Sequence, residues 1–392
     1  MTPDTDIAIV GGGLSGTIAA IALARTGARV TLIDRNEVAT PEFRVEKLGG
    51  EQLTKLERLG LLEVLAQNST RFDRAVNVRH GRVVDHSDVR YQGIFYDDLV
   101  NAMRRALPAS VRTVVGRVTD LSTGPDRQLV TVADHGDISA RLVVLASGMS
   151  DILRARLGIE REVLHERQSL TFGFNLRPAD PITKRPALTL YGERPGDGID
   201  YLALFPIGEL IRANLFAFLD HRHPWVKELR TDPLAALEPK LPKLRQHLGD
   251  VVLDGKVQSW IMDLAVARNV RRPGIVLIGD AYQTSCPAAG TGVSRLLTDV
   301  QRLLAHVTNW LETPGMDAEK IAAFYDDPVK SAMDAHALGQ AEFRRSFTID
   351  TSLVWRTRRQ AQFLRRRLLN GLDRLSPPLA ASIRSLRAAS RR

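Results

Sequence analysis

The chain has 392 residues, which is enough for two or three domains of roughly 150 residues each. Its 44% apolar and 25% charged residues are typical of a globular protein, which excludes a disordered chain, a collagen-like chain and a small disulfide scaffold. The net charge of +9 comes from the C-terminal end: residues 344–392 contain 13 arginines and two acidic residues, and the preceding residues carry a net charge of −2. The body of the chain therefore gives no indication of nucleic-acid binding.

Cysteine content and apolar runs bear on the compartment. Cys286 is the single cysteine, so no internal disulfide can form, as is usual in a reducing compartment. No run approaches the ~18 apolar residues of a membrane span. Strand-like sequence begins by Asp6 with no signal peptide ahead of it, and we expect a cytoplasmic protein.

The N-terminal part of the chain alternates between strands and helices. Residues 6–34 have the pattern of a buried strand, a glycine turn, an alanine-rich helix and a second strand, which is a βαβ unit. Amphipathic helices are predicted at 50–67 and 97–107, and a β-rich stretch follows at 111–145. This order predicts an α/β fold.

The pattern changes to β-like segments between Gln168 and Trp260, and the α/β pattern resumes with a strand at 274–278 and a helix at 292–311. We therefore predict a first domain formed by residues 1–165 and 263–343. A mixed β-sheet domain, residues 166–262, is inserted into it, and residues 344–392 form a basic helical C-terminal region.

A glycine motif lies between the first strand and the first helix. Gly11, Gly13 and Gly16 form G-x-G-x-x-G in the context that dinucleotide binding requires. The glycines allow a tight turn and a close approach to a pyrophosphate, which would lie at the helix N-terminus beside Leu14 and Ser15.

The acidic residue that accompanies such a motif is Asp34, which ends the second strand 18 residues after Gly16 and is followed by Arg35. A carboxylate there accepts hydrogen bonds from a ribose diol. The motif predicts an adenine dinucleotide, FAD or NAD, and does not choose between them.

A second motif follows the strand at 274–278. Its members, in chain order, are Gly279, Asp280, Ala281, Pro287, Gly290, Gly292 and Asp299. Their spacing resembles the second FAD fingerprint of the para-hydroxybenzoate-hydroxylase-type (class A) FAD-dependent monooxygenases. The resemblance selects FAD and implies that Asp280 accepts from the ribityl chain and that Pro287 packs beside the isoalloxazine. The amides that would face flavin N1 and O2 are those of Gly290, Thr291, Gly292 and Val293, at a helix N-terminus that stabilises negative charge.

The family resemblance implies a Rossmann-like FAD-binding domain whose inserted sheet holds the substrate. It implies a monooxygenase that hydroxylates an apolar aromatic or polycyclic small molecule through a flavin C4a-hydroperoxide, with NAD(P)H as a transient reductant and O2. Three alternatives stay open: a flavin-dependent halogenase, for which Lys47 is a candidate; a prenyl-chain reductase or dehydrogenase; and a flavin-binding scaffold that recruits partners through its basic tail.

Three positions depart from the family pattern. The middle motif Asp-Gly-x-x-Ser-x-x-Arg begins here with Ser147, although Gly148 and Arg154 are retained. The Arg before the Leu-containing helix is Tyr96, and the His after Gly-Asp-Ala is Gln283. In the family the middle motif is associated with FAD and with the nicotinamide, so Ser147 bears on direct reduction by NAD(P)H.

Other candidates follow from their positions. Arg44 and Lys47 lie where the family has a loop that touches FAD and borders the substrate, and Val118 matches a strand that meets the adenine. Cys286 precedes Pro287 and is a candidate redox thiol, although a lone buried cysteine is more often a packing residue.

Proton transfer from a phenolic substrate requires a base. The family resemblance implies that the inserted sheet faces the flavin, which favours Tyr201 for this role. Tyr191, His165 and His223 are the other candidates. Metal-binding and serine-hydrolase motifs are absent from the sequence, so no metal site is predicted.

The basic tail contains a helical stripe formed by Leu364, Leu368, Leu372 and Leu375, which Pro377 and Pro378 would end. Three interpretations stay open. The leucines pack on the body with the arginines in solvent, the helix lies on an anionic membrane surface, or it binds an acidic partner such as a carrier protein.

Overall fold

The computed structural model describes residues 3–180 and 186–375. The chain divides into two compact units. Unit 1 consists of Met1–Thr70, Gln92–Gln168 and Met262–Ala341, and unit 2 of Arg71–Tyr91, Ser169–Ile261 and Glu342–Arg392. Unit 2 thus includes the predicted insertion together with a strand pair from nearer the N-terminus, which the sequence pattern did not assign to it.

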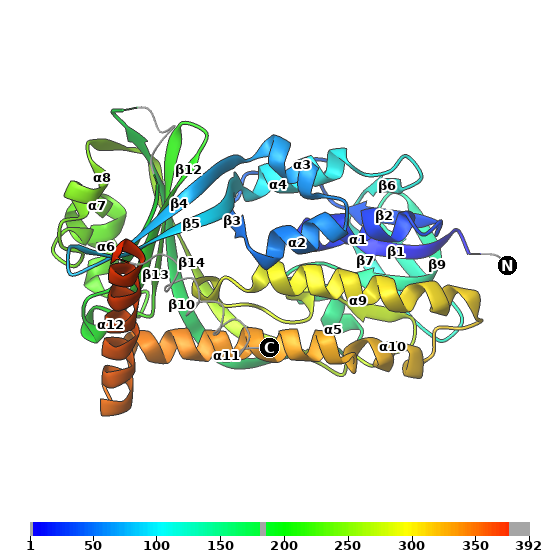
Figure 1. Ribbon diagram of the computed structural model, residues 1–392. Coiled ribbons are helices and arrows are strands. Elements are labelled where there is room, and N and C mark those ends of the chain that lie inside the picture. Colours follow the sequence, from blue (N-terminus) through cyan, green and yellow to red (C-terminus); the bar gives the residue numbers. More distant parts are fainter. Residues whose placement is uncertain (1–2, 181–185, 376–392) are drawn as a thin grey trace. The chain divides into compact units, whose positions relative to one another are not determined.

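Unit 1 contains a seven-stranded sheet of order β6-β2-β1-β9-β8-β7, with β15 also paired to β9 (Figure 1). Five strands are parallel neighbours: β6 (Arg112–Val115), β2 (Val30–Asp34), β1 (Thr5–Val10), β9 (Gly136–Leu145) and β15 (Ile275–Leu277). The strands β7 (Val118–Ser122) and β8 (Gln128–Val132) join them as antiparallel neighbours. This topology confirms the predicted Rossmann-like domain.

Both faces of this sheet are buried. Successive side chains of a strand point to opposite faces, so each strand contributes residues to two apolar clusters. In β1, Ile7 and Ile9 belong to one apolar cluster, and Ala8 and Val10 belong to the other. The first cluster is covered by the helices α1 (Leu14–Ala24), α2 (Glu51–Arg58), α3 (Leu62–Asn68), α4 (Tyr96–Arg105) and α9 (Gly292–Glu312). Unit 1 also contains the short helices α5 (Ile152–Arg156) and α10 (Ala318–Tyr325).

The helix predicted over 50–67 is divided into α2 and α3. Gly60 lies between them with φ +65°, a left-handed conformation that a glycine adopts without strain and that ends a helix. The other predicted helices of unit 1 are present with ends shifted by one or two residues.

The second sheet has the order β14-β10-β13-β12-β11-β4-β5-β3. Its strands are β14 (Val251–Arg268), β10 (Glu160–Pro178), β13 (Leu210–Ala217), β12 (Ile199–Ile207), β11 (Ala187–Tyr191), β4 (Thr70–Arg79), β5 (Arg82–Phe95) and β3 (Val45–Gly49). The pair β11–β4 is parallel, whereas β10–β13, β13–β12 and β12–β11 are antiparallel. The second sheet is therefore mixed, as predicted, although its parallel pair includes β4, which lies outside the predicted insertion.

Helices that the β-like pattern did not predict pack on this sheet. They are α6 (Pro224–Thr231), α7 (Pro233–Leu237) and α8 (Leu244–Leu248). Trp225, Leu229 and Leu237 are buried with the strand residues Phe172 and Leu215 in one apolar cluster. The short helices therefore supply one side of the core of unit 2.

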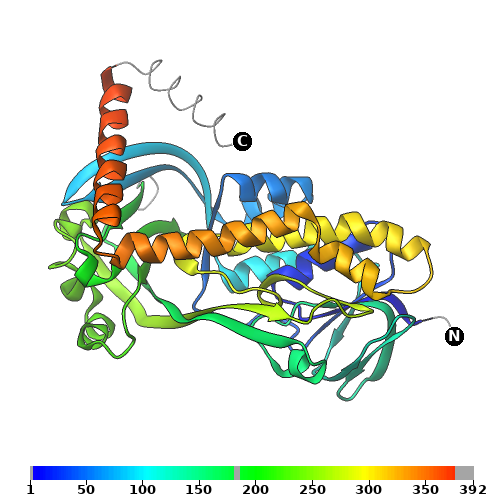
Figure 2. The same ribbon diagram turned by 90° about the horizontal axis from the view of Figure 1, so that it is seen from below.

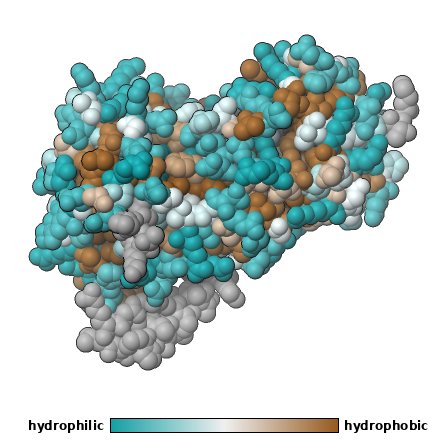
Figure 3. Space-filling view, turned by 90° about the horizontal axis from the view of Figure 1, so that it is seen from above, coloured by the Kyte–Doolittle hydropathy of each residue, from teal (hydrophilic) through white to brown (hydrophobic). Residues whose placement is uncertain are grey.

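The C-terminal helices are α11 (Pro328–Ile349), which continues from unit 1 into unit 2, and α12 (Leu353–Leu375). Figure 2 shows α12 leaving the end of α11 at a sharp angle. The predicted tail helix is present, and Pro377 and Pro378 lie outside the described residues. Within the described ranges, no helix is long and apolar enough to cross a membrane. The face drawn in Figure 3 carries hydrophobic side chains interspersed with hydrophilic ones.

Candidate functional site

The glycine loop between β1 and α1 requires glycine at two positions. Gly11 has φ +107°, and a Cβ there would lie 2.4 Å from the carbonyl oxygen of Ala146. A Cβ on Gly16 would lie 1.9 Å from the carbonyl oxygen of Gly11. The loop therefore folds tightly against the end of β9, which leaves the first turn of α1 at the carboxyl edge of the sheet, where such folds bind ligands.

Asp34 closes this loop from the end of β2. Its Oδ2 accepts a hydrogen bond from the Gly12 N–H at 2.6 Å, and its Oδ1 accepts one from the Asn36 N–H at 2.9 Å. Arg35, the next residue, is exposed. Asp34 thus positions the loop itself, and its predicted contact with a ribose stays a prediction.

Arg104 on α4 holds the same loop and was missed by sequence reasoning. Its guanidinium donates to the carbonyl oxygen of Gly12 at 2.7 and 2.9 Å and to those of Asn36 and Glu37 at 2.7 Å each. It also lies 3.4 Å from Asp34 Oδ1. One planar cation therefore fixes both the glycine loop and the turn after β2.

The second motif lies directly against the first. Gly279, with φ +61°, begins the turn that carries Asp280, and a Cβ on Gly279 would lie 2.3 Å from Ser15 Oγ on α1. The Gly279 N–H donates to Asp299 Oδ2 at 2.9 Å. Arg154 of the middle motif is buried and donates to the carbonyl oxygen of Ala281 at 2.5 Å. All three family motifs therefore meet in unit 1.

Two buried hydroxyl groups close to these three motifs are available to a ligand. The Oγ of Ser147 and the Oγ1 of Thr291 are buried and have no hydrogen-bond partner among the described residues. A Cβ built on Gly148 or Gly290 would meet nothing within 4 Å, so the backbone there borders open space. Hydroxyl donors next to backbone that borders open space, near the N-termini of α1 and α9, are suited to binding a dinucleotide such as FAD.

Arg44 reaches the second motif. Its guanidinium lies 3.7 Å from Asp280 Oδ2 and 3.9 Å from the centre of the Tyr96 ring. The Tyr96 hydroxyl, which replaces the family's Arg, accepts from the Leu14 N–H at 3.4 Å. Burial opposes the charge of Arg44, but Tyr96, Glu42 and Asp280 raise its pKa. A permanent cation therefore lies near the first turn of α1, where a pyrophosphate would bind.

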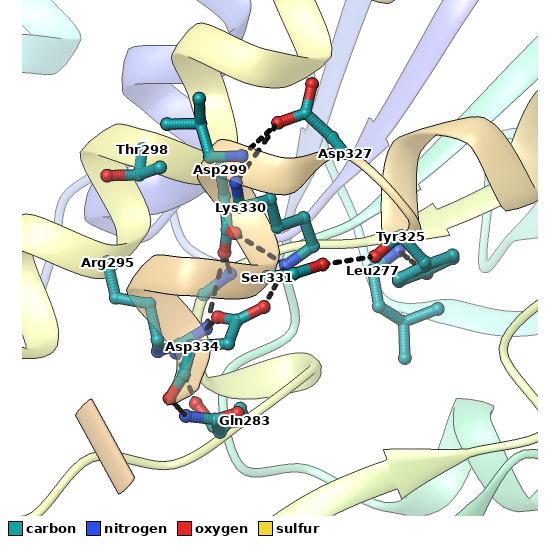
Figure 4. A network of polar contacts seen from close by, with 12 residues as sticks. Leu277, Gln283, Arg295, Thr298, Asp299, Tyr325, Asp327, Lys330, Ser331 and Asp334 are labelled. Atoms are coloured by element: carbon teal, nitrogen blue, oxygen red, sulfur yellow. Dashed lines mark hydrogen bonds and ion pairs between the residues drawn. The ribbon is translucent and has the colours of Figure 1, made fainter. Parts of the chain in front are cut away.

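A buried ion network includes Asp299 of the second motif and residues of α9 and α11 (Figure 4). Lys330 Nζ donates to Asp299 Oδ1 at 2.8 Å and to Asp334 Oδ2 at 2.9 Å. Arg295 Nη1 lies 3.3 Å from Asp299 Oδ2, and Arg295 Nη2 lies 3.7 Å from Asp280 Oδ1. Burial opposes the charge of Lys330, yet the two carboxylates raise its pKa; burial and Asp299 raise the pKa of Asp334.

This network includes Asp299 from the predicted motif but extends to residues that sequence reasoning missed. Two pairs have the four-residue spacing that indicates an ion pair on a helix: Arg295 with Asp299 on α9, and Lys330 with Asp334 on α11. That spacing was the available signal, although nothing in it indicates that the pairs are buried together.

Strand β3 carries two ionisable side chains beside this region. Burial raises the pKa of Glu46 to about 7, with Arg44 opposing and Asp280 reinforcing the shift. Burial lowers the pKa of Lys47, the predicted catalytic lysine. Glu46 is thus a titrating group near neutral pH that the sequence did not single out.

The remaining flavin candidates are placed as follows. Pro287 begins the short turn before Gly290, and Cys286 beside it is fully buried. Gly292 and Val293 open α9. Val118 begins β7, two residues after Gly116, whose N–H donates to the Asp34 carbonyl oxygen at 2.8 Å.

The base candidates are in different places. Tyr201 and Tyr191 are neighbours in unit 2, with ring centres 6.2 Å apart, and Tyr201 also packs on Phe216 at 4.7 Å. His223 accepts from the Trp225 N–H and caps α6, which is a structural role. His165 lies on β10 in unit 1. The role of Tyr201 as a base stays a prediction.

Comparison with known proteins agrees with this geometry. Residues 4–313 match the family model described as FAD binding domain. The chain is 27% identical over 340 residues to aklavinone 12-hydroxylase DnrF of Streptomyces peucetius, with 76% of this chain and 66% of that protein covered. It is 29% identical over 170 residues to protein FixC of Salmonella typhi, with 40% of each covered. The chain thus spans only part of the length of these relatives.

Solved structures share the fold. p-Nitrophenol 4-monooxygenase PnpA from Pseudomonas putida DLL-E4 aligns with a TM-score of 0.74 at 17% identity, over 93% of this chain and 94% of that one. HpxO of Klebsiella pneumoniae, solved with FAD and uric acid, aligns with a TM-score of 0.72 at 16% identity over 98% of each chain. The match of residues 4–313 to the FAD binding domain model confirms the predicted FAD-binding family and the cofactor FAD, and the solved structures confirm the fold. The chain therefore belongs to the FAD binding domain family, the family of flavoproteins that its two glycine motifs predict.

Proposed function

We propose that this protein is an FAD-dependent monooxygenase that hydroxylates an apolar aromatic or polycyclic small molecule, with NAD(P)H as reductant and O2 as oxidant. The observation that carries the proposal is the convergence of three motifs on the Gly279–Ala281 turn. Ser15 of the first motif lies against Gly279. Arg154 of the middle motif donates to the carbonyl oxygen of Ala281, and Asp299 of the second FAD motif accepts from the Gly279 N–H. The sequence similarity to aklavinone 12-hydroxylase supports hydroxylation as the reaction.

When bound, FAD would supply the hydride and oxygen chemistry. The chain's own contribution is binding and electrostatics. The first turn of α1 and Arg44 would bind the pyrophosphate, and Asp280 the ribityl hydroxyls. The first turn of α9, from Gly292, would place backbone N–H groups toward the reduced ring, where they stabilise negative charge without reorganisation.

A test of the cofactor site is Asp280→Ala. Removing this carboxylate should weaken FAD binding by about tenfold or more, because a charged hydrogen-bond acceptor contributes roughly 1.5–3 kcal/mol. Equilibrium binding of FAD to the apoprotein measures the effect. Asp326→Ala, an exposed aspartate beyond α10, is the matched control and should bind FAD as the unaltered protein does. Equal FAD affinity in Asp280→Ala would contradict the assignment of the second motif.

The reductant is tested by anaerobic mixing of the FAD-loaded protein with NADH and with NADPH while oxidised-flavin absorbance is followed. Bleaching by either nucleotide supports a self-contained monooxygenase. Ser147→Asp, which restores the family's acidic residue, should accelerate the reduction. Flavin that stays oxidised with both nucleotides, with and without candidate aromatic substrates, contradicts NAD(P)H as reductant and favours a halogenase or a dehydrogenase supplied by another route.

Substrate-base assignment is a separate proposal. Tyr201→Phe should lower turnover and remove a pH dependence from it. FAD affinity should stay unchanged, because Tyr201 is not among the residues that we propose to bind FAD. We also propose that the C-terminal helices bring the enzyme to a partner surface, and the side chains that α12 exposes indicate which kind.

A further inference from the structure

Helix α12 has two chemically different sides: one packs within unit 2, and the other presents an apolar stripe bordered by arginines. We propose that this outer side of α12 binds the surface of an anionic lipid membrane. The inference does not depend on the hydroxylase activity, because it rests only on the surface chemistry of α12.

The inner side of α12 is held by an aromatic ring and two arginines. Phe363 is buried, with its ring centre 5.1 Å from that of Tyr191. Arg359 is buried and donates to the carbonyl oxygen of Phe347 at 2.8 Å, and Arg366 donates to the Tyr191 hydroxyl at 2.9 Å. This packing excludes the simplest expectation for the tail, in which the leucines face the body and the arginines face solvent.

The outer side carries large aliphatic side chains. Leu353 is 72% exposed, Val354 59%, and Leu364 and Leu368 60% each. Leu353, Leu364 and Leu368 are eleven and four residues apart, which at 3.6 residues per turn places them within about 60° of one another around the helix. They form a straight stripe roughly 22 Å long, and exposed aliphatic side chains in line favour an apolar partner.

Arginines border this stripe on both sides. Arg356 and Arg367 lie on one border and Arg358 and Arg365 on the other, as the helical repeat places them, and all four are exposed. The sequence has no acidic residue between Asp350 and Asp373, and residues 376–392 add four arginines and no acidic residue. An apolar stripe with basic borders is the pattern of a helix that lies in the plane of a membrane interface, with its arginines on anionic headgroups.

The same features argue against other partners. A nucleic acid would use the arginines but would leave the leucines in water, and the aromatic Trp355 packs inward against Phe343, with ring centres 5.5 Å apart, instead of offering a stacking surface. An acidic protein would likewise need its own apolar groove in register with the stripe. A lipid surface satisfies both the stripe and its borders without such a match.

The experiment is sedimentation of the FAD-loaded full chain with sucrose-loaded vesicles. One vesicle preparation contains phosphatidylcholine alone, and the other contains phosphatidylcholine with about a third phosphatidylglycerol. We expect binding to the anionic vesicles, weak binding to the neutral ones, and loss of binding in high salt, because surface attraction is screened.

Two double variants separate the apolar and the basic contribution. Leu364→Gln with Leu368→Gln should weaken binding to anionic vesicles about tenfold or more, since it removes the groups that enter the interface. Arg356→Gln with Arg367→Gln should weaken it about fivefold per charge. The control combines Val252→Gln with Arg222→Gln, two exposed positions of unit 2 that are not part of α12, and should bind like the unaltered protein. Flavin absorbance and the unfolding midpoint confirm that each variant is folded.

Several outcomes would overturn the proposal. The first is an unaltered protein that stays in the supernatant with both vesicles, which would point to a protein partner. The second is vesicle binding that survives both α12 variants. The third is a dimer in light scattering that becomes a monomer on Leu364→Gln with Leu368→Gln, because the stripe would then be a contact between two copies. None of these outcomes bears on FAD binding or on reduction by NAD(P)H.

Discussion

The backbone N–H of Gly279 donates to the buried carboxylate of Asp299 at 2.9 Å. This single bond ties the turn that carries Asp280 to the first turns of α9, so the position of the carboxylate that we propose for the ribityl chain depends on the placement of Asp299. Lys330 and Arg295 stabilise that charge from two other directions. The second motif is therefore stabilised by buried ion pairs, in which the cations Lys330 and Arg295 neutralise the carboxylates Asp299 and Asp334.

Lys330→Met tests this support. The change leaves Asp299 and Asp334 near each other in a buried site, with Arg295 as the remaining cation of the network described above, and the breaking of a buried ion pair costs about 3–5 kcal/mol. Urea unfolding should show a loss of that size. The double variant Lys330→Met with Asp334→Asn restores the balance of charge and should recover most of the stability. A single variant within about 0.5 kcal/mol of the unaltered protein would show that Lys330 does not stabilise the site.

Gly16→Ala tests the glycine loop. The new methyl group would collide with the carbonyl oxygen of Gly11, so the loop must move and FAD affinity should fall at least about tenfold. Gly339→Ala in α11 is the control, because a Cβ there meets nothing within 4 Å; it should keep FAD affinity and gain about 0.5–1 kcal/mol of stability. Binding titrations and unfolding of both variants check the pair. Unchanged FAD affinity in Gly16→Ala would contradict the close approach.

Arg104→Gln tests the cation that holds the glycine loop. Its loss removes the guanidinium donor from the carbonyl oxygens of Asn36 and Glu37 and from that of Gly12, which keeps the Thr17 hydroxyl at 3.0 Å. We expect weaker FAD binding together with a destabilisation of about 1–3 kcal/mol. Its neighbour Arg105 is exposed and donates to the side chain of Asn68 at 3.0 Å, away from the carbonyl oxygens that Arg104 holds. Arg105→Gln should therefore change both quantities little, and equal effects in the two variants would assign the loss to charge rather than to the loop.

Glu46→Gln tests the titrating group on β3. Burial raises the pKa of Glu46 from 4.5 to about 7, so the folded protein keeps this proton over a range in which the unfolded chain has lost it. The stabilisation from this raised pKa is fully present below pH 4.5 and is lost as the pH rises to about 7, up to about 3 kcal/mol. Unfolding midpoints measured across this range should show a flatter pH dependence in Glu46→Gln. Parallel curves for the two proteins would show that Glu46 titrates normally.

Sequence alone determined the parts of this protein that depend on local backbone chemistry. Gly11, Gly16 and Gly279 are required by close approaches of the backbone, and the spacing of the second motif was enough to identify the α9 N-terminus and Asp299. Such motifs are legible because a tight turn at a helix N-terminus tolerates few residues at each position. The alternation of apolar residues likewise predicted both sheets, because strand periodicity is a local property.

Tertiary structure alone decided which distant residues act on these motifs. Lys330 and Asp334 have the spacing of an ordinary surface ion pair, and only packing of α11 on α9 buries them against Asp299. On α12 the leucine stripe was visible in the sequence, but the direction in which it faces was not. The packing of Phe363 and Arg359 leaves Leu364 and Leu368 exposed to solvent. The physical reason is the same in both cases. Helical spacing defines which residues share a face, whereas the element that packs on the helix defines which face is covered.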